Sequence, residues 1–200
     1  MRRAATVLVV ALAVVVVAVA AIDVIGPAGG LTPGSASAII SRDGLTLAAD
    51  TPCARPPAQC PARYTFAPGR VMTLWFSVRN AGALDLTVDG IDDWVRSLPA
   101  DPLVRPIDVL DGGDVARGFE DVSTPFVRLV LHPGDQRLIG IRLRTTSDMR
   151  FACDHWAPGG AIGWSDVPVS WHWLAARRVT KIPLMREFQM STPTASDCAR

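Results

Sequence analysis

Apolar and polar residues alternate most clearly over residues 70–91, with the period of two that a strand with one buried face requires. The alternation at 70–79 places four apolar side chains on one face: Met72, Leu74, Phe76 and Val78. Asn80-Ala81-Gly82 then supplies residues that favour a turn. Residues 84–88 resume the alternation, so we predict a β-hairpin over 70–91.

The same period recurs in the C-terminal half of the chain. Residues 126–131 and 137–145 flank His132-Pro133-Gly134-Asp135 and form a second hairpin-like pair in this interpretation. Its predicted inward residues are Val127, Leu129, Leu131, Ile139, Ile141 and Leu143, and its outward residues are Arg142 and Arg144. Two further strands are predicted at 167–175 and 179–184, with Trp171 and Trp173 on the face of Val169.

The remaining segments are less regular. Residues 38–48 fit a first strand or a short hairpin around Asp43-Gly44. Residues 92–125 are predicted to be a loop with one short strand near 107–110, and their carboxylates are expected to be solvated. About seven short strands without a helical segment after residue 25 predict an all-β fold, an antiparallel immunoglobulin-like β-sandwich.

A run of 19 uncharged residues, 4–22, precedes these strands. As a helix it would extend roughly 28 Å, close to the thickness of a bilayer core. Arg2 and Arg3 before it predict a cytoplasmic N-terminus and an extracytoplasmic C-terminal part. We therefore expect a single-pass transmembrane anchor at 1–25, and the alternative is a signal segment cleaved near Ala20, which would give a secreted protein.

Composition limits the organisation and the partners of the residues after the apolar run. Residues 26–37 are rich in Gly, Pro and Ser, which predicts a flexible linker, and 38–200 are sufficient for one domain. The net charge is +1, and no basic block follows the apolar run, so nucleic acid is not an expected partner. Arginine supplies nearly all basic residues, which indicates a GC-rich bacterial genome.

The four cysteines, Cys53, Cys60, Cys153 and Cys198, all follow the apolar run. In an oxidising compartment two disulfides are the expected state. Three pairings are open. Proximity favours Cys53 with Cys60, which leaves Cys153 for Cys198, and the spacings match no usual zinc pattern.

Several short motifs resemble those of a group of membrane-anchored, secreted actinobacterial proteins without an established activity. They are Arg79-Asn80-Ala81-Gly82, Leu86-Thr87-Val88, Leu131-His132-Pro133-Gly134-Asp135, the segment from Cys153 through Pro158-Gly159, and Cys198-Ala199-Arg200. The resemblance covers roughly residues 64–200. It implies an immunoglobulin-like sandwich with a C-terminal cysteine tied back to the body, and it implies no catalytic function.

Tryptophan supplies the candidate binding surface. Trp75 falls on the polar face of its strand, where an exposed ring would suit a protein interface or stacking against a sugar. Trp94 and Trp156 complete this candidate surface. The alternative for Trp75 is burial beneath residues 92–125.

No catalytic motif such as G-x-S-x-G or H-E-x-x-H occurs, so an enzyme is not expected and no cofactor is implied. The sequence thus favours a non-enzymatic cell-envelope module that binds an envelope protein or has a structural role. A cell-wall carbohydrate is the alternative ligand. A third hypothesis is metal binding by Asp154, His155 and His172, with Met149 or Met190 as a soft ligand.

Overall fold

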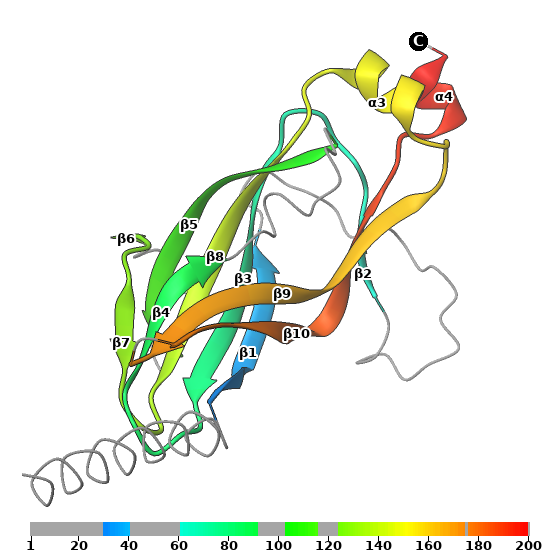
Figure 1. Cartoon of the computed structure of the whole chain (residues 1–200). Coiled ribbons are helices and arrows are strands. Elements are labelled where there is room, and N and C mark those ends of the chain that lie inside the picture. Colours follow the sequence, from blue (N-terminus) through cyan, green and yellow to red (C-terminus); the bar gives the residue numbers. More distant parts are fainter. Residues whose placement is uncertain (1–29, 41–60, 92–102, 116–123, 175, 200) are drawn as a thin grey trace, which may run out of the picture.

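The computed structural model describes residues 30–40, 61–91, 103–115, 124–174 and 176–199. These residues form two sheets of five strands each and two short helices (Figure 1). The elements are β1 (Leu31–Ile40), β2 (Ala62–Tyr64), β3 (Val71–Asn80), β4 (Leu86–Ile91), β5 (Val104–Asp114), β6 (Thr124–Pro125), β7 (Leu129–Leu131), β8 (Gln136–Thr145), α3 (Met149–His155), β9 (Ala161–Trp173), β10 (Ala176–Ser191) and α4 (Ala195–Cys198).

The order of the strands is that of an immunoglobulin-type sandwich. Sheet A has the order β1-β3-β8-β5-β6, and sheet B has the order β2-β10-β9-β4-β7. Without the short strands β2, β6 and β7, seven strands remain. In chain order they form an A-B-E-D sheet and a G-F-C sheet, the arrangement of constant-type immunoglobulin domains. The predicted all-β sandwich of about seven strands is confirmed.

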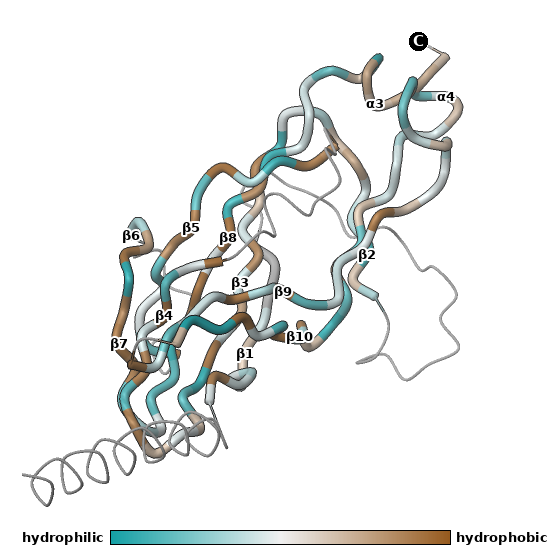
Figure 2. The backbone as a smooth tube through the Cα atoms, viewed as in Figure 1, coloured by the Kyte–Doolittle hydropathy of each residue, from teal (hydrophilic) through white to brown (hydrophobic). Residues whose placement is uncertain are grey.

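The inner faces of both sheets form one apolar core. The alternation in β3 and β8 correctly predicted which side chains face it, because Met72, Phe76, Ile139 and Leu143 are all buried. Trp171 and Trp173 of the opposing sheet are buried in this core together with Val169, whose face they were predicted to share. Figure 2 shows apolar stretches in β3 and β8 of one sheet and in β4 and β9 of the other.

Two predicted hairpins are wrong in their pairing. β3 pairs with β1 and β8, whereas β4 pairs with β7 and β9 in the other sheet. β7 and β8 are likewise in different sheets. Each strand exists, but the connection after it crosses from one sheet to the other. Val127, predicted to face the core, is 73% exposed because it lies outside β7.

Asn80 fixes the crossing between β3 and β4. Its side chain is fully buried, and its amide donates to the carbonyl oxygens of Leu84 and Leu131, each at 2.9 Å. The side-chain oxygen accepts from the N–H of Gly82 at 2.9 Å. A residue predicted as a turn former therefore joins the connection after β3 to a strand of sheet B.

The linker predicted at 26–37 is wrong for residues 31–37, because these belong to β1 at the edge of sheet A. Pro33 and Gly34 are tolerated there because an edge strand needs only one hydrogen-bonded neighbour. The register with β3 shifts between Pro33 and Ser37, as in a β-bulge. The Ser77 hydroxyl reaches the irregular part by donating to the Ala36 carbonyl and accepting from its N–H.

β9 and β10 form the one predicted hairpin that the structure confirms as a sequence-adjacent pair, and Leu174 begins the turn after β9. β5 extends to Val104–Asp114, well beyond the short strand predicted at 107–110. The predicted absence of helices is also wrong, since α3 and α4 cap the end of the sandwich (Figure 1). Asp148 caps α3, and a Thr194–Asp197 capping box begins α4.

Cys153 in α3 is disulfide-bonded to Cys198 in α4, as predicted. The predicted Cys53–Cys60 pair and the apolar segment 4–22 lie outside the described residues. No helix among the described residues has the length and apolar character needed to cross a membrane.

Candidate binding surface

Trp75 lies on the outer face of sheet A, as the alternation predicts, but it is not exposed. Only 6% of the residue is accessible. Its ring lies over Gly140 of β8 and Gly112 of β5, where a Cβ atom would come within 2.6 Å and 2.7 Å of it, respectively. Leu110 and Leu138 bury it further. The prediction that Trp75 offers a contact surface is therefore wrong.

Trp156, the second tryptophan of the predicted surface, is not brought beside Trp75. Trp156 packs against the inner core, whereas Trp75 belongs to the separate outer cluster. The Trp156 indole N–H is buried and finds no acceptor among the described residues. Trp94 lies outside them. A sugar-stacking platform built on Trp75 is thus not supported.

Sheet B, in contrast, presents a continuous row of outward side chains across four strands. Register places Arg177 of β10 beside His172 of β9, His172 beside Thr87 of β4, and Thr87 beside Val130 of β7. Val130 is 54% exposed, and Val179, two residues beyond Arg177, is 52% exposed. These residues form a candidate binding surface that combines apolar and basic groups.

A carboxylate organises the middle of this surface. Asp89 occupies the irregular position between Val88 and Gly90, where the pairing of β4 with β9 shifts. Its two oxygens lie 3.1 Å and 3.0 Å from Nδ1 of His172. The Nε atom of Arg128 is 2.8 Å from Asp89 Oδ1. Since Asp89 is mostly buried and Arg128 mostly exposed, the network fixes His172 and presents a cation to solvent.

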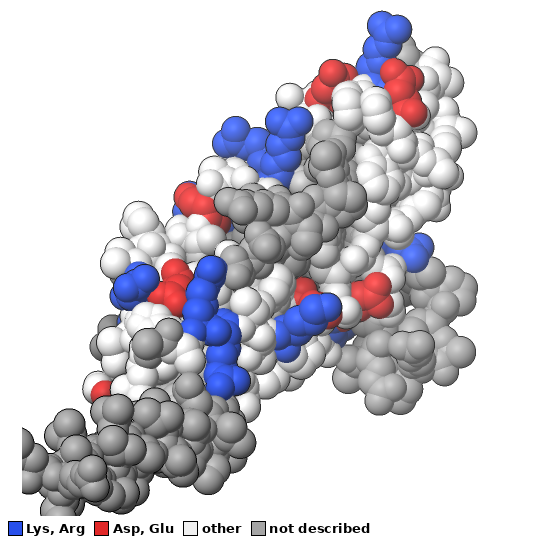
Figure 3. Space-filling model, in the orientation of Figure 1, with Lys and Arg blue, Asp and Glu red and all other residues white. Residues whose placement is uncertain are grey.

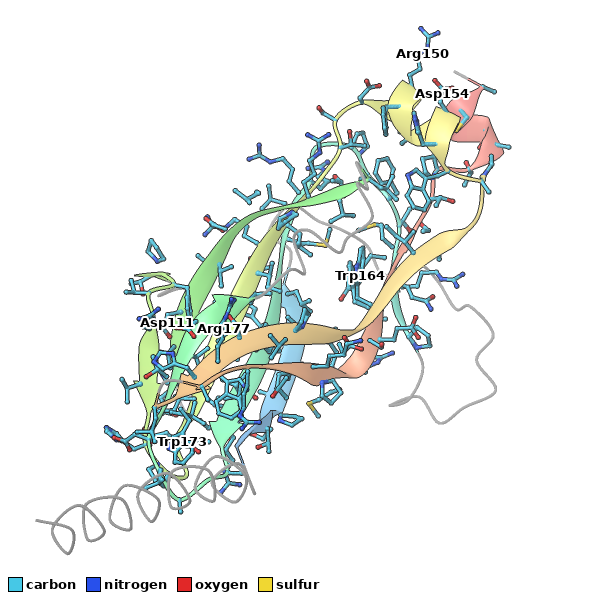
Figure 4. All side chains as sticks on the ribbon, in the orientation of Figure 1. Asp111, Arg150, Asp154, Trp164, Trp173 and Arg177 are labelled. Carbon is cyan, nitrogen blue, oxygen red and sulfur yellow. A yellow bond between two sulfur atoms is a disulfide. The ribbon has the colours of Figure 1, made fainter. Side chains whose placement is uncertain are left out.

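The charge exposed on this side is largely basic. Arg177 and Lys181 are both exposed on β10. Figure 3 shows basic side chains over the strands β4, β9 and β10, and Figure 4 shows Arg177 beside the same strands. On the outer face of sheet A, Arg137 pairs with Asp111 and Arg142 pairs with Asp108.

The residues of the metal hypothesis do not converge. His172 binds Asp89 in sheet B, whereas His155 lies in α3 and stacks on Phe151 with 3.8 Å between ring centroids. Asp154 lies at the helical end of the molecule, opposite Trp173 (Figure 4). Among the residues that the structure describes, no group of three potential metal ligands occurs.

His132, at the turn before β8, provides a pH-dependent contact. Its Nδ1 lies 2.9 Å from Asp85 Oδ1, and Asp135 adds negative charge. Hydrogen bonding and attraction to Asp85 raise the pKa of His132 above its ordinary value of 6.5. The contact therefore stabilises the fold fully below the unfolded-state pKa, and this contribution is lost as pH rises through the folded-state pKa.

We expect NMR titration to give a His132 pKa above 6.5 in the native protein and a lower one in Asp85→Asn. The stability difference between the native protein and His132→Gln should shrink as pH increases through that pKa. The effect should be small, because both side chains are exposed and screened by solvent. Identical pKa values in the two proteins would contradict the assigned cause.

No family model matches the sequence, and no curated protein matches it. Nine chains of solved structures match this chain in fold comparison, among them the following two. The Vibrio cholerae VesB protease is 16% identical, with a TM-score of 0.34, and 67% of this chain covers 31% of the protease. The ASH/PapD-like domain 7 of human CEP192 is 11% identical, with a TM-score of 0.30, and 78% of this chain covers 98% of that domain.

Sequence reasoning missed Asp89 and Arg128. In the sequence, Asp89 is one of several polar residues on the outward face of an alternating strand. Arg128 belongs to a different predicted strand pair, so nothing in the sequence links the two. Only the pairing of β4 with both β7 and β9 brings them to His172. No spacing along the chain predicts these contacts.

Proposed function

We propose that the protein is an anchored, extracytoplasmic and non-enzymatic module of the cell envelope that binds another protein through the outer face of sheet B. The observation that carries this proposal is the row from Arg177 to Val130, which includes His172 of the Asp89–His172–Arg128 network. Exposed valines lie on both sides of the network, Val130 at one end of the row and Val179 beyond Arg177 at the other. The apolar run 4–22 in the sequence supports the anchored placement.

The chemistry of the surface favours a protein partner with an apolar centre and an acidic rim. Val130 and Val179 offer apolar area, while Arg177, Lys181 and Arg128 offer exposed positive charge. Interfaces commonly combine an apolar centre with a polar rim, and arginine is enriched in them. The network holds its side chains in place before binding, which reduces the entropy lost on association.

Affinity capture of the full chain from detergent-solubilised envelopes of its host tests this proposal. A Val130→Ser, Val179→Ser and Arg177→Glu triple variant should lose the captured partner by about tenfold or more, as expected for losing the central contacts of an interface. Ile107→Ser is the matched control, since Ile107 is 44% exposed on sheet A. Equal capture by all three proteins, or no partner reproducibly captured, would reject the proposed surface.

A further inference from the structure

We infer that the end of the sandwich at which β1 begins lies directly on the lipid bilayer and inserts two leucines, Leu84 and Leu174, into the headgroup region. This inference rests on the anchored form proposed above. It concerns a different surface from the outer face of sheet B. The partner is the membrane itself rather than a second protein.

The position of β1 along the chain places this end near the bilayer. The apolar run ends at Ile22 and β1 begins at Leu31, so only eight residues, 23–30, separate them. Eight residues reach at most about 28 Å when fully extended. The domain therefore remains within a short distance of the membrane surface, with the end that carries Leu31 closest to it.

Three connections meet at this end. Leu31 of β1 pairs with Asn80, the last residue of β3. The N–H of Ala81 donates to the Gly30 carbonyl at 3.0 Å, and the Gly134 N–H donates to the Asn80 carbonyl at 2.9 Å. The β9–β10 turn also lies here, because Trp173 lines one small hollow together with Gly30 and Leu84.

A leucine at position 174 is unfavourable both in its exposure and in its backbone conformation. It is 70% exposed, and it has a φ of 51°, a left-handed conformation that glycine and asparagine adopt much more readily. Neither packing nor turn geometry explains a leucine there. Leu84, in the β3–β4 connection, is 52% exposed, and the hollow beside it is lined by Leu86 and Trp171 as well.

Charge does not account for attraction to the membrane at this end. Arg79 and His132 are exposed there, but so are Asp85 and Asp135, and His132 already interacts with Asp85. A surface with both signs of charge around apolar tips fits the headgroup region of a bilayer, where apolar burial supplies the affinity. We therefore expect a contact that does not require anionic lipid.

Photo-cross-linking of the full chain in vesicles tests this inference. The chain is reconstituted in phosphatidylcholine that includes a headgroup-diazirine analogue, and cross-linked peptides are identified by mass spectrometry. Peptides containing Leu84 and Leu174 should cross-link, and they should still do so at about 0.5 M salt, where charges are screened within a few ångströms. The peptide containing Arg150, at the opposite end (Figure 4), should not.

A Leu84→Ser and Leu174→Asn double variant should reduce cross-linking at this end by about fivefold or more, since membrane affinity scales with buried apolar area. Asparagine tolerates the left-handed conformation, so folding is preserved at residue 174. Met185→Ser, at another residue that is 65% exposed, should leave cross-linking unchanged.

The outcomes separate this inference from the proposed function. Membrane-retained protein whose peptides with Leu84 and Leu174 cross-link no more than the peptide with Arg150 would overturn the lipid contact and leave the partner surface intact. Protein that does not remain with the vesicles would overturn both the anchor and the contact. Loss of cross-linking in the Met185→Ser control would also overturn the assignment, since contact would then not be specific to this end.

Discussion

Trp75→Ala is expected to lower the free energy of unfolding by about 3–5 kcal/mol, the usual cost of removing a large buried aromatic ring. The ring is 6% exposed and forms the centre of the cluster on the outer face of sheet A. Its removal would leave a cavity over Gly140 and Gly112, which have no side chains to fill it. Urea denaturation followed by circular dichroism measures the change. A loss below about 1 kcal/mol would indicate a surface position.

A second substitution distinguishes the contact between the Trp75 ring and Gly140 from a general loss of stability. In Gly140→Ala the new Cβ would lie 2.6 Å from the Trp75 ring, so the strand or the ring must move, at a cost of about 1–3 kcal/mol. In the Trp75→Ala background the same methyl group enters the cavity and should cost much less. The two effects should therefore be coupled by about 1 kcal/mol or more. Strict additivity would show that the ring does not lie over Gly140.

Replacing both Cys153 and Cys198 with serine is expected to destabilise the protein by up to about 4 kcal/mol, because the bond closes a loop of 45 residues in the unfolded chain. The bond joins α3 to α4, so α4 should also become locally accessible. Urea denaturation measures the first effect, and limited proteolysis at 192–199 measures the second.

The double variant is preferable to a reducing agent, because reduction would also affect any bond between Cys53 and Cys60. Asp154→Ser in α3 is the control, since it changes an exposed neighbour of Cys153 and leaves the bond intact. A double variant with native stability and native resistance to protease would contradict a stabilising role for this bond.

The sequence predicted which strands exist and which side chains face inward better than it predicted pairing. Alternation is a property of one strand, so Ile139, Ile141 and Leu143 were assigned to the core correctly. The pairing of two strands depends on the path of the connection between them. The residues at 80–82 permit a turn, but they do not specify whether the following strand stays in the same sheet. Asn80, which binds the Leu131 carbonyl, decides this through a contact 51 residues away.

The candidate surface illustrates a second limit. The outward orientation of Trp75 followed from its place in the alternation, but its burial depends on two glycines in other strands, Gly140 and Gly112. Similarly, the sequence shows His172 between Trp171 and Trp173, but its partner Asp89 comes from a strand that sequence distance does not identify. The alternation within one strand determines which way a side chain points, but residues from other strands determine whether that side chain is buried.

The crossing connections after β3 and β7 also bear on how fast this domain can fold. Among the long strands of the described residues, only β9 and β10 pair with their immediate neighbour in the chain. β3 must find β8, and β4 must find β9, across long intervening segments. Such non-local pairing places sandwiches among the slow-folding domains, on a timescale of about milliseconds to seconds. We therefore expect the β9–β10 hairpin to form early and sheet A to assemble only after β8 (residues 136–145) becomes available for pairing with β3 and β5.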